Sequence, residues 1–470
     1  MAVVESSPPD RLPRGLAPER FLRGRFGDWV ARPWLDRAVF GSLARYFPLS
    51  RLWAAASVAD GDLGRFGEEV PLGRSATTDG WLLEQALVGV HRACRWHRRI
   101  DQAWRRRFFS PGPAPSAKVL VETELERRAA ARVWMASRGL LMPLLAVTEP
   151  PAVRWSVPAA SEMEALFGPA LADPAAYYAA PEPLPDIEQS HEVPGPEGME
   201  YWLRFASPGR ATRDTAWAKV YEPETPADGA PTLILCHGLA VEVEMWGTGI
   251  GIPYALIRAG VRVIAPEAPW HNRRMAPGRW GGEPMIATAP RGAPDLFQAS
   301  LGEIAVLTAW ARGQGTAAVA LGGTSLGALT SQLAAVQAAQ WPPALRPDLL
   351  YLVATGGSVQ QVAVDSELAD VFGLDDALAA AGWDDAALAR LEPLTDPLGP
   401  PVMPPERVVM VLGRADSVTR FDEGRELATR WRVPAENLFV RAQGHFSIPL
   451  GLLHDDAPLR RLGALMKTAG

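Results

Sequence analysis

The chain has 470 residues, of which 48% are hydrophobic and 21% are charged, and its formal net charge is −6. This composition is typical of a globular protein that is too long for one ordinary domain. The acidic net charge argues against a general affinity for nucleic acid.

Cysteine usage and hydropathy indicate the cellular compartment in which the protein is expected. Cys94 and Cys236 are the two cysteines, and their wide separation predicts neither a disulfide framework nor a metal site. The first residues lack the basic start and apolar core of a signal peptide. No apolar run is long enough to span a bilayer. We therefore expect a cytoplasmic protein with no stable membrane insertion.

Residues 21–142 are expected to be helical. Between Trp81 and Phe108, apolar residues recur at roughly the helical period, and Thr78 or Asp79 would cap the start of this helix. The same segment carries seven arginines, which indicate either a surface for anionic partners or a solvated helix face. We favour the solvated face, because the protein as a whole is acidic.

The helical N-terminal region, residues 1–142, is expected to contain a second helix over residues 121–137. Residues 143–196 are rich in proline, which removes hydrogen-bond donors and fixes φ. This stretch predicts a connection that wraps over a surface, with a short helix near residues 161–168. The pattern changes near residue 195, and a second domain is assigned to residues 197–470.

The second domain begins with two alternating segments that predict antiparallel strands, and apolar runs separated by helix-like segments follow. Such alternation predicts a mostly parallel sheet with helices on both faces. Ligand chemistry in such a sheet belongs at the carboxyl ends of the strands. The expected strands are 199–206, 215–223, 231–238, 261–269, 316–325, 348–357, 407–416 and 437–445, and the expected helices are 249–259, 297–312, 326–339 and 456–468.

Three side chains of complementary chemistry stand at the ends of three of these strands. Ser325 lies between Gly323 and Gly327, where a strand turns into a helix and leaves the hydroxyl projecting outward. Asp416 and His445 follow two later strands. A serine needs a base to take its proton, and the base needs a carboxylate to orient it. The pattern predicts Ser325 as nucleophile, His445 as base and Asp416 as acid.

Other assignments of the same residues are kept as alternatives. Ser325 could be only the N-cap of the helix that follows it. The acid could come from an earlier strand end or a nearby loop, and the candidates there are Asp396, Asp422 and Asp365.

Residues 197–470, somewhat over half of the chain, resemble an α/β-hydrolase domain. The matching motifs are CHG at 236–238, GTSLG at 323–327, GRADSVT at 413–419 and GHFS at 444–447. The resemblance implies an α/β-hydrolase fold, preceded here by the helical N-terminal region, and it implies no metal or organic cofactor.

Two backbone N–H groups are expected to form the oxyanion hole. Leu326 begins the helix after the nucleophile, so that its N–H and the helix dipole face the site. The N–H of Leu239, which follows the CHG motif, would lie opposite. His237 precedes the serine in the chain, and we expect it to support this loop and not to act as the base.

Two further segments are candidates for the surroundings of the active site. The polar segment 269–284 either borders the site or forms a plain surface loop; His271, Arg273 and Arg274 are its candidate substrate contacts. The helical insertion at about 360–395 is expected to form a cap over the serine, with a peripheral decoration as the alternative.

These residues predict a serine hydrolase of carboxylesterase type that works through an acyl-enzyme. An acyltransferase, a thioesterase or a peptidase would use the same triad, and a non-catalytic binding protein could keep the same fold. A lipase held at a membrane surface by the arginine-rich helix is a further alternative. The expected partner is a small-molecule ester or other acyl substrate, with no nucleic acid, and a homo-oligomer is compatible with the sequence.

Overall fold

A single mixed sheet forms the centre of the molecule. The computed structural model describes residues 10–13, 25–70, 80–146, 149–242 and 252–469. In these residues ten strands pair in the order β1-β3-β4-β6-β5-β7-β8-β9-β10, and β2 pairs with β3. The strands are β1 (Glu188–Gln189), β2 (Val193–Pro194), β3 (Gly198–Ala206), β4 (Thr215–Pro223), β5 (Thr232–Cys236), β6 (Arg262–Pro266), β7 (Val319–Thr324), β8 (Leu349–Val353), β9 (Val408–Gly413) and β10 (Leu438–Arg441).

The sheet is antiparallel at one edge and parallel over the rest. β3 pairs antiparallel with β4, and β4 pairs antiparallel with β6. Every pair from β6 to β10 is parallel. The predicted mostly parallel sheet is therefore confirmed. Because the strands from β5 to β10 run the same way, their carboxyl ends share one edge, where the predicted site residues stand.

Both faces of the parallel strands are buried. On β5, Leu233 and Leu235 enter one core, whereas Ile234 and Cys236 enter the other. This accounts for the continuous apolar runs in the sequence. α12, α13 and α19 cover one face, and α10, α20 and α21 cover the other. These helices are α10 (Ile252–Arg258), α12 (Gly292–Gly313), α13 (Leu326–Gln337), α19 (Phe421–Arg430), α20 (Ser447–Gly451) and α21 (Ala457–Thr468).

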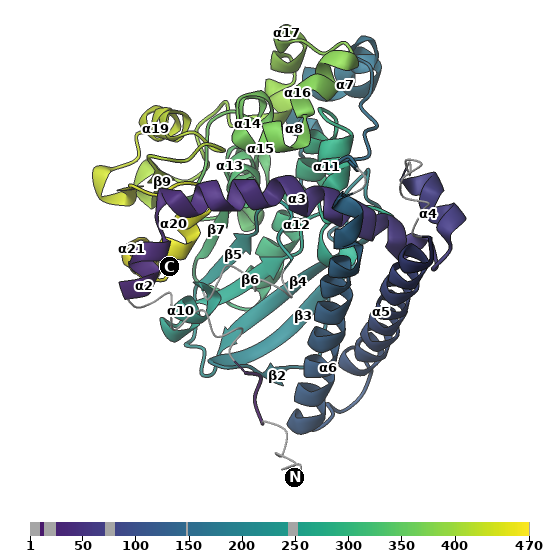
Figure 1. The fold of residues 1–470 in the computed structure, drawn as a ribbon. Helices are drawn as coiled ribbons and strands as arrows, with labels where there is room; N and C mark the ends of the chain where they lie inside the picture. The colour runs from purple at the N-terminus through teal and green to yellow at the C-terminus, as the bar shows by residue number, and fades with distance from the viewer. Residues whose placement is uncertain (1–9, 14–24, 71–79, 147–148, 243–251, 470) are drawn as a thin grey trace.

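The N-terminal region is helical, as predicted, and packs directly on the sheet. Trp104 and Phe108 share one buried cluster with Trp202 of β3 and Trp217 of β4. The long helix α3 lies across the molecule at the carboxyl edge of the strands (Figure 1). The helices are α2 (Arg25–Val30), α3 (Pro33–Val58), α4 (Leu63–Glu69), α5 (Gly80–Phe108), α6 (Ala117–Ala136) and η2 (Ser137–Ala146). The predicted caps Thr78 and Asp79 lie outside the described residues.

A cluster of short helices stands above the carboxyl edge of the sheet (Figure 1). Most of it is inserted between β8 and β9, and the proline-rich connection packs on it: Trp383 Nε1 donates to the carbonyl of Pro158 at 2.7 Å. The helices are η3 (Ala160–Glu162), α7 (Met163–Ala172), α8 (Pro174–Tyr177), α14 (Val359–Val364), α15 (Glu367–Phe372), α16 (Leu374–Ala380), α17 (Asp385–Ala389) and α18 (Glu392–Thr395). α7 matches the short helix expected near residues 161–168.

The remaining short helices lie in loops: η4 (Asn272–Arg274), α11 (Glu283–Ala287), η5 (Ala338–Gln340), η6 (Pro343–Leu345), η7 (Pro405–Arg407) and η8 (Ala435–Asn437). None of the helices in the described residues has the length and apolar content to cross a membrane.

Candidate active site

The turn between β7 and α13 holds Ser325 in a strained conformation. Its φ of 55° and ψ of −124° lie in a region that non-glycine residues seldom occupy. The two flanking glycines allow the turn because there is no room for a side chain. A Cβ on Gly323 would lie 2.3 Å from the carbonyl carbon of Gly327, and a Cβ on Gly327 would lie 2.2 Å from the carbonyl oxygen of Cys236.

The structure brings together the serine, the histidine and the aspartate predicted from the strand ends. His445 Nε2 lies 2.9 Å from Ser325 Oγ. On the other side of the ring, Nδ1 lies 3.0 Å from both carboxylate oxygens of Asp416. The tautomer that satisfies both contacts carries its proton on Nδ1, which donates to Asp416 and leaves Nε2 free to accept from the serine hydroxyl.

Asp416 is fixed by its own loop. Its Oδ1 accepts the backbone N–H groups of Val418 and Thr419, both at 2.9 Å, and its Oδ2 accepts the Thr419 hydroxyl at 2.9 Å. The alternative acids are placed elsewhere. Asp396 accepts the N–H of Val359 in the helical insertion, and Asp422 forms an exposed pair with Arg425. The third alternative, Asp365, is exposed at the end of α14.

The two expected oxyanion donors lie beside the serine. Leu239 and Leu326 line the same cavity as Ser325. Leu326 is the first residue of α13, so its N–H has no partner within the helix. The N–H of Leu239 donates to no acceptor in the described part of the chain. The next residue, Ala240, has a φ of 57° and turns the loop sharply.

Two buried histidines hold this loop in a reciprocal way. His237 follows β5, and its Nε2 accepts the N–H of Ala268 in the loop after β6, at 3.1 Å. His271 follows β6, and its Nε2 accepts the N–H of Ala240 in the loop after β5, at 3.2 Å. Each ring donates from Nδ1 to a nearby carbonyl at 2.8 Å. We call this pair the histidine clasp.

Burial favours the neutral form of both histidines of the clasp. Burial lowers the pKa of His237. Burial, reinforced by the neighbouring His237, lowers the pKa of His271 to about 3. A neutral ring is required, because a protonated ring would have no lone pair on Nε2 to accept the Ala240 N–H. His271, predicted as a substrate contact, thus fixes the backbone next to Leu239.

The cavity beside Ser325 is almost entirely apolar and has a volume of about 110 Å³. One wall comes from α11, α12 and the loop that follows β5 and carries Leu239, which we call the oxyanion loop. The other wall comes from the helices inserted between β8 and β9. The insertion therefore borders the cavity beside the serine. Its contribution includes Val362, Ala363, Leu368, Phe372, Leu378 and Leu388.

The observation that decides the fold is the combination of this topology with the site. A parallel sheet carries a strained serine at a strand-to-helix turn, and Asp416 and His445 follow at later strand ends in that order. The second domain has the α/β-hydrolase fold.

The chain was also compared with known proteins. No protein-family model and no curated sequence matches the chain. A cold-adapted esterase from an Arctic intertidal metagenomic library is 16% identical with a TM-score of 0.38, and the match covers 59% of this chain and 96% of that one. Acetyl xylan esterase 1 from a Thermoanaerobacterium species is 18% identical with a TM-score of 0.41, with 64% and 96% covered. An S-formylglutathione hydrolase from Agrobacterium tumefaciens is 15% identical with a TM-score of 0.37, with 58% and 98% covered.

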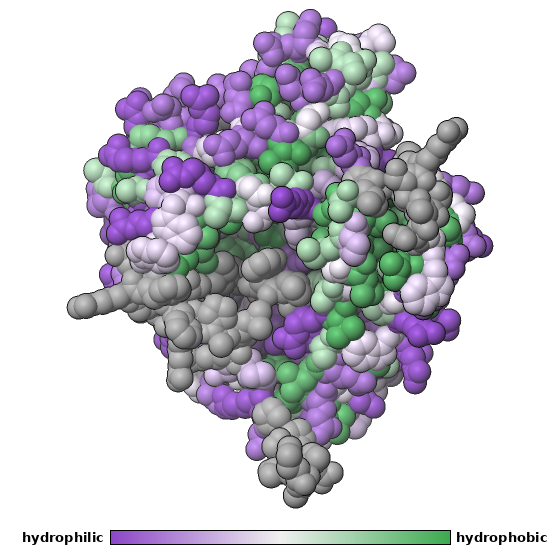
Figure 2. Space-filling view, viewed as in Figure 1, coloured by the Kyte–Doolittle hydropathy of each residue, from purple (hydrophilic) through white to green (hydrophobic). Residues whose placement is uncertain are grey.

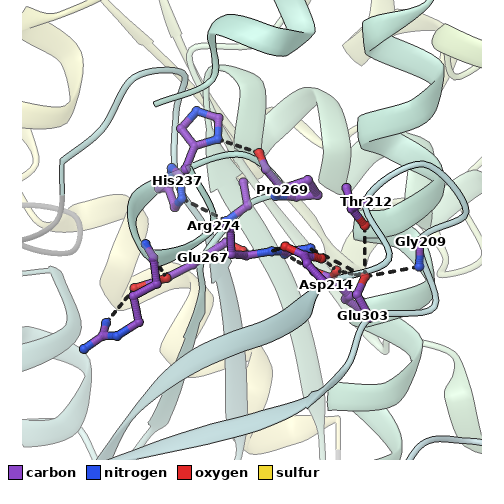
Figure 3. A network of polar contacts seen from close by, with 12 residues as sticks. Gly209, Thr212, Asp214, His237, Glu267, Pro269, Arg274 and Glu303 are labelled. Carbon is purple, nitrogen blue, oxygen red and sulfur yellow. Dashed lines mark hydrogen bonds and ion pairs between the residues drawn. The ribbon is translucent and has the colours of Figure 1, made fainter. Parts of the chain in front are cut away.

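Arg274 of the hydrolase domain is engaged by the protein's own carboxylates. Its guanidinium bonds Asp214 at 2.8 and 2.9 Å and Glu303 at 2.8 and 2.9 Å (Figure 3). Burial alone would lower the pKa of this guanidinium, but Glu303 and Asp214 raise it above its ordinary value. A side chain that is 1% exposed and satisfied on both edges is not available to a substrate carboxylate. We therefore correct the substrate-contact interpretation of Arg274 to a structural one.

Arg273 is also turned away from the serine. Its guanidinium lies 4.1 Å from the ring centre of Trp202 and bonds Glu267 Oε1 at 2.9 Å. A second carboxylate, that of Asp101 on α5, lies 3.7 Å from Nε. Arg273 does not line the Ser325 cavity, and it instead joins the N-terminal helices to the loop after β6.

Two contacts from the N-terminal region support the loops that carry candidate site residues, and the sequence reasoning missed both. Asp36 of α3 accepts the N–H of Phe446 at 2.6 Å and the hydroxyl of Ser447 at 2.6 Å, directly after His445. Arg138 of η2 pairs with Glu242 in the oxyanion loop. Neither Asp36 nor Arg138 belongs to a local sequence motif. The sequence does not indicate these contacts, because each partner lies more than 100 positions away in the chain.

Proposed function

We propose that the protein is a serine hydrolase that cleaves carboxylic esters with an apolar acyl group. The observation that carries the proposal is the aligned contact from Ser325 Oγ to His445 Nε2 at 2.9 Å, continued from Nδ1 to Asp416 at 3.0 Å. A nucleophile and a base within hydrogen-bond distance, with the base oriented by a third group, is the arrangement that nucleophilic catalysis requires.

The reaction would proceed in two balanced halves. His445 takes the proton of Ser325 as its oxygen bonds the ester carbonyl carbon, and the carbonyl oxygen becomes an oxyanion held by the N–H groups of Leu239 and Leu326. The C–O bond to the alcohol then breaks as His445 returns the proton to the leaving oxygen. Water, deprotonated by His445, attacks the acyl-enzyme and releases the carboxylic acid and the free serine.

The chemistry of the cavity supports an apolar acyl group. Apart from Ser325, Gln360 and Thr395, its lining is apolar, and no charged side chain among the described residues lines it. Burying a carboxylate or an ammonium there without a partner would cost several kcal/mol, roughly the effective desolvation penalty of an ion in a protein. Esters of acids with a charged acyl chain are therefore expected to be poor substrates.

The test is hydrolysis of p-nitrophenyl esters and labelling by a fluorophosphonate probe. Ser325→Ala is expected to abolish both, because the reacting oxygen is removed. Ser42→Ala, which changes an exposed serine of α3, is the matched control and should retain both. Labelling of Ser325→Ala at the wild-type rate, or no labelling of the wild type, would overturn the proposal.

A further inference from the structure

A second cavity lies apart from Ser325, between α5 and the loop that follows β6. It is an open cleft of about 830 Å³, within the size range of small-molecule sites. One wall is the arginine-rich face of α5. The facing wall is formed by residues 272–279, and the floor is formed by Trp53 and Trp134 of the N-terminal region.

The α5 wall concentrates positive charge on one helix face. Arg95, Arg98 and Arg99 are three and four positions apart, so they project from the same side of the helix, and all three line the cleft. All three are exposed, and none forms an ion pair in the part of the chain that the structure describes. Like charges at this spacing destabilise a helix unless a counter-charge is present.

The cleft itself supplies too few counter-charges. Asp101 is the only acidic side chain among the described lining residues, and its carboxylate is already shared. It accepts from Arg105 at 2.7 Å and lies 3.7 Å from Arg273 Nε. Arg279 adds a further guanidinium from the facing wall, where its Nη1 lies 3.0 Å from Glu283. Arg95, Arg98 and Arg99 are thus left without an acidic partner among the described residues that line the cleft.

Aromatic side chains complete the walls. The ring of His97 stacks on Trp134 with centroids 4.7 Å apart, and Trp53 packs against the same indole. Trp96 lines the cleft and is 39% exposed. Apolar residues also gather on the surface over α5 and α6 (Figure 2).

We propose that this cleft binds a multiply charged anion of the phosphate class. Guanidinium groups bind phosphate oxygens in a bidentate way, and each phosphate monoester carries about −1.5 to −2 charges at neutral pH, which matches three unbalanced arginines. The phosphate belongs either to a free small molecule or to the headgroup of an anionic lipid. The arginines that the sequence assigned to a solvated helix face are in this way a ligand-binding wall.

The first arm of the test uses pyrophosphate as the probe and the full chain at low ionic strength, measured by calorimetric titration. The double variant Arg95→Gln/Arg99→Gln is expected to raise the Kd by about tenfold or more, because charge-assisted hydrogen bonds are lost. The matched control is Arg92→Gln/Arg106→Gln, which removes two exposed arginines of the same helix that do not line the cleft. It should change the Kd by no more than about twofold.

The second arm distinguishes the source of the phosphate by co-sedimentation with vesicles of phosphatidylcholine, with or without phosphatidylglycerol. Binding to the anionic vesicles alone, lost in Arg95→Gln/Arg99→Gln and kept in the control pair, assigns the site to a lipid headgroup. Pyrophosphate binding without vesicle binding assigns it to a free small molecule.

Three outcomes would overturn the proposal: no binding of either probe at roughly 10 mM phosphate, equal weakening by both double variants, or equal binding to neutral vesicles. The thermal midpoint of each variant shows that it is folded. It should not fall in the cleft variant, because like-charge repulsion on α5 is relieved.

Discussion

Asp36 accepts a hydrogen bond from the hydroxyl of Ser447 at 2.6 Å, although the two residues are 411 positions apart in the chain. The other carboxylate oxygen accepts the N–H of Phe446 at 2.6 Å. The loop that carries His445 is thus held from α3, a helix outside the α/β-hydrolase domain. The N-terminal region therefore helps to hold the loop of the candidate base His445 in place.

The first prediction concerns this clamp. Asp36→Ala leaves the backbone N–H groups of Phe446 and Ser447 without their acceptor and removes the closer of the two acceptors of the Ser447 hydroxyl, at a cost of about 1–3 kcal/mol per buried group left unpaired. Misplacement of His445 should lower the kcat for p-nitrophenyl ester hydrolysis by about 10- to 100-fold, with little change in KM. Asp36→Asn keeps one acceptor oxygen and should recover much of the loss.

The control for the clamp is Arg37→Ala, which truncates the exposed neighbour on α3 and should behave as the wild type. Fluorophosphonate labelling rates, measured well below the thermal midpoint of each variant, separate a misplaced base from unfolding. A folded Asp36→Ala protein with the wild-type kcat would contradict the positioning role.

The histidine clasp predicts a specific pH dependence of stability. The pKa of His271 is lowered to about 3 in the folded chain, whereas its ordinary value is about 6.5. Between these values the unfolded chain binds a proton that the folded chain does not, so the free energy of unfolding falls as the pH falls. His271 contributes a slope of about 1.4 kcal/mol per pH unit to the free energy of unfolding. The stabilisation that depends on neutral His271 is fully present above a pH of about 6.5.

His271→Gln removes the titrating group and keeps an oxygen able to accept the Ala240 N–H. Urea unfolding at several values between pH 4 and 7 should show a shallower decline than in the wild type. Burial also lowers the pKa of His237, so part of the decline persists. His454→Gln, a change at an exposed histidine, is the control. An unchanged slope in His271→Gln would show that the clasp histidine is not buried neutral.

Local pattern was sufficient to predict the sheet and the candidate triad. Each strand is an apolar run with its own boundary, and parallel strands bring their carboxyl ends to one edge, so Ser325, Asp416 and His445 could be grouped without knowing any long-range contact. The flanking glycines indicated the sharp turn in which Ser325 is held. Catalytic roles for these residues stay predictions until the variants are measured.

Residues that act through distant partners could not be predicted in the same way. Asp36 and Arg138 lie on helices. The hydrophobic pattern of a helix predicts which of its faces is buried, but it does not predict which loop packs against that face. For Arg274, the local pattern suggested a role that the fold does not support. A polar loop at a strand end indicates a ligand contact, and only the fold shows that Glu303 and Asp214 already pair with the Arg274 guanidinium. Charge type alone does not distinguish a substrate-binding arginine from a structural one.

Crowding at the turn around Ser325 predicts a severe effect for a single added methyl group. In Gly327→Ala the new Cβ would lie 2.2 Å from the Cys236 carbonyl oxygen, and this contact is with backbone, which cannot rotate away. The start of α13 must then move from β5, which misplaces Ser325. We expect a loss of about 3 kcal/mol or more in unfolding free energy and no measurable ester hydrolysis.

Gly463→Ala is the control for this substitution, because a Cβ at that position in α21 meets nothing within 4 Å. It should leave activity unchanged and stabilise the helix by up to about 1 kcal/mol. The two free energies come from denaturant unfolding under the same conditions, and a Gly327→Ala protein as stable as the Gly463→Ala protein would contradict the argument from crowding.

The last prediction tests whether the insertion between β8 and β9 sets the acyl specificity. Ala363 of α14 lines the 110 Å³ cavity beside Ser325, and a larger side chain there would occupy space that a long acyl chain needs. Ala363→Phe should lower kcat/KM for p-nitrophenyl octanoate by about tenfold or more relative to the acetate, since each methylene in such a pocket contributes about 1–3 kcal/mol. Ala379→Phe, on the exposed side of α16, adds the same bulk outside the cavity and should leave the ratio unchanged. If Ala363→Phe keeps acetate hydrolysis and loses octanoate hydrolysis, the cavity holds the acyl chain. If both variants keep the wild-type ratio of kcat/KM for octanoate to kcat/KM for acetate, the acyl group does not enter this cavity.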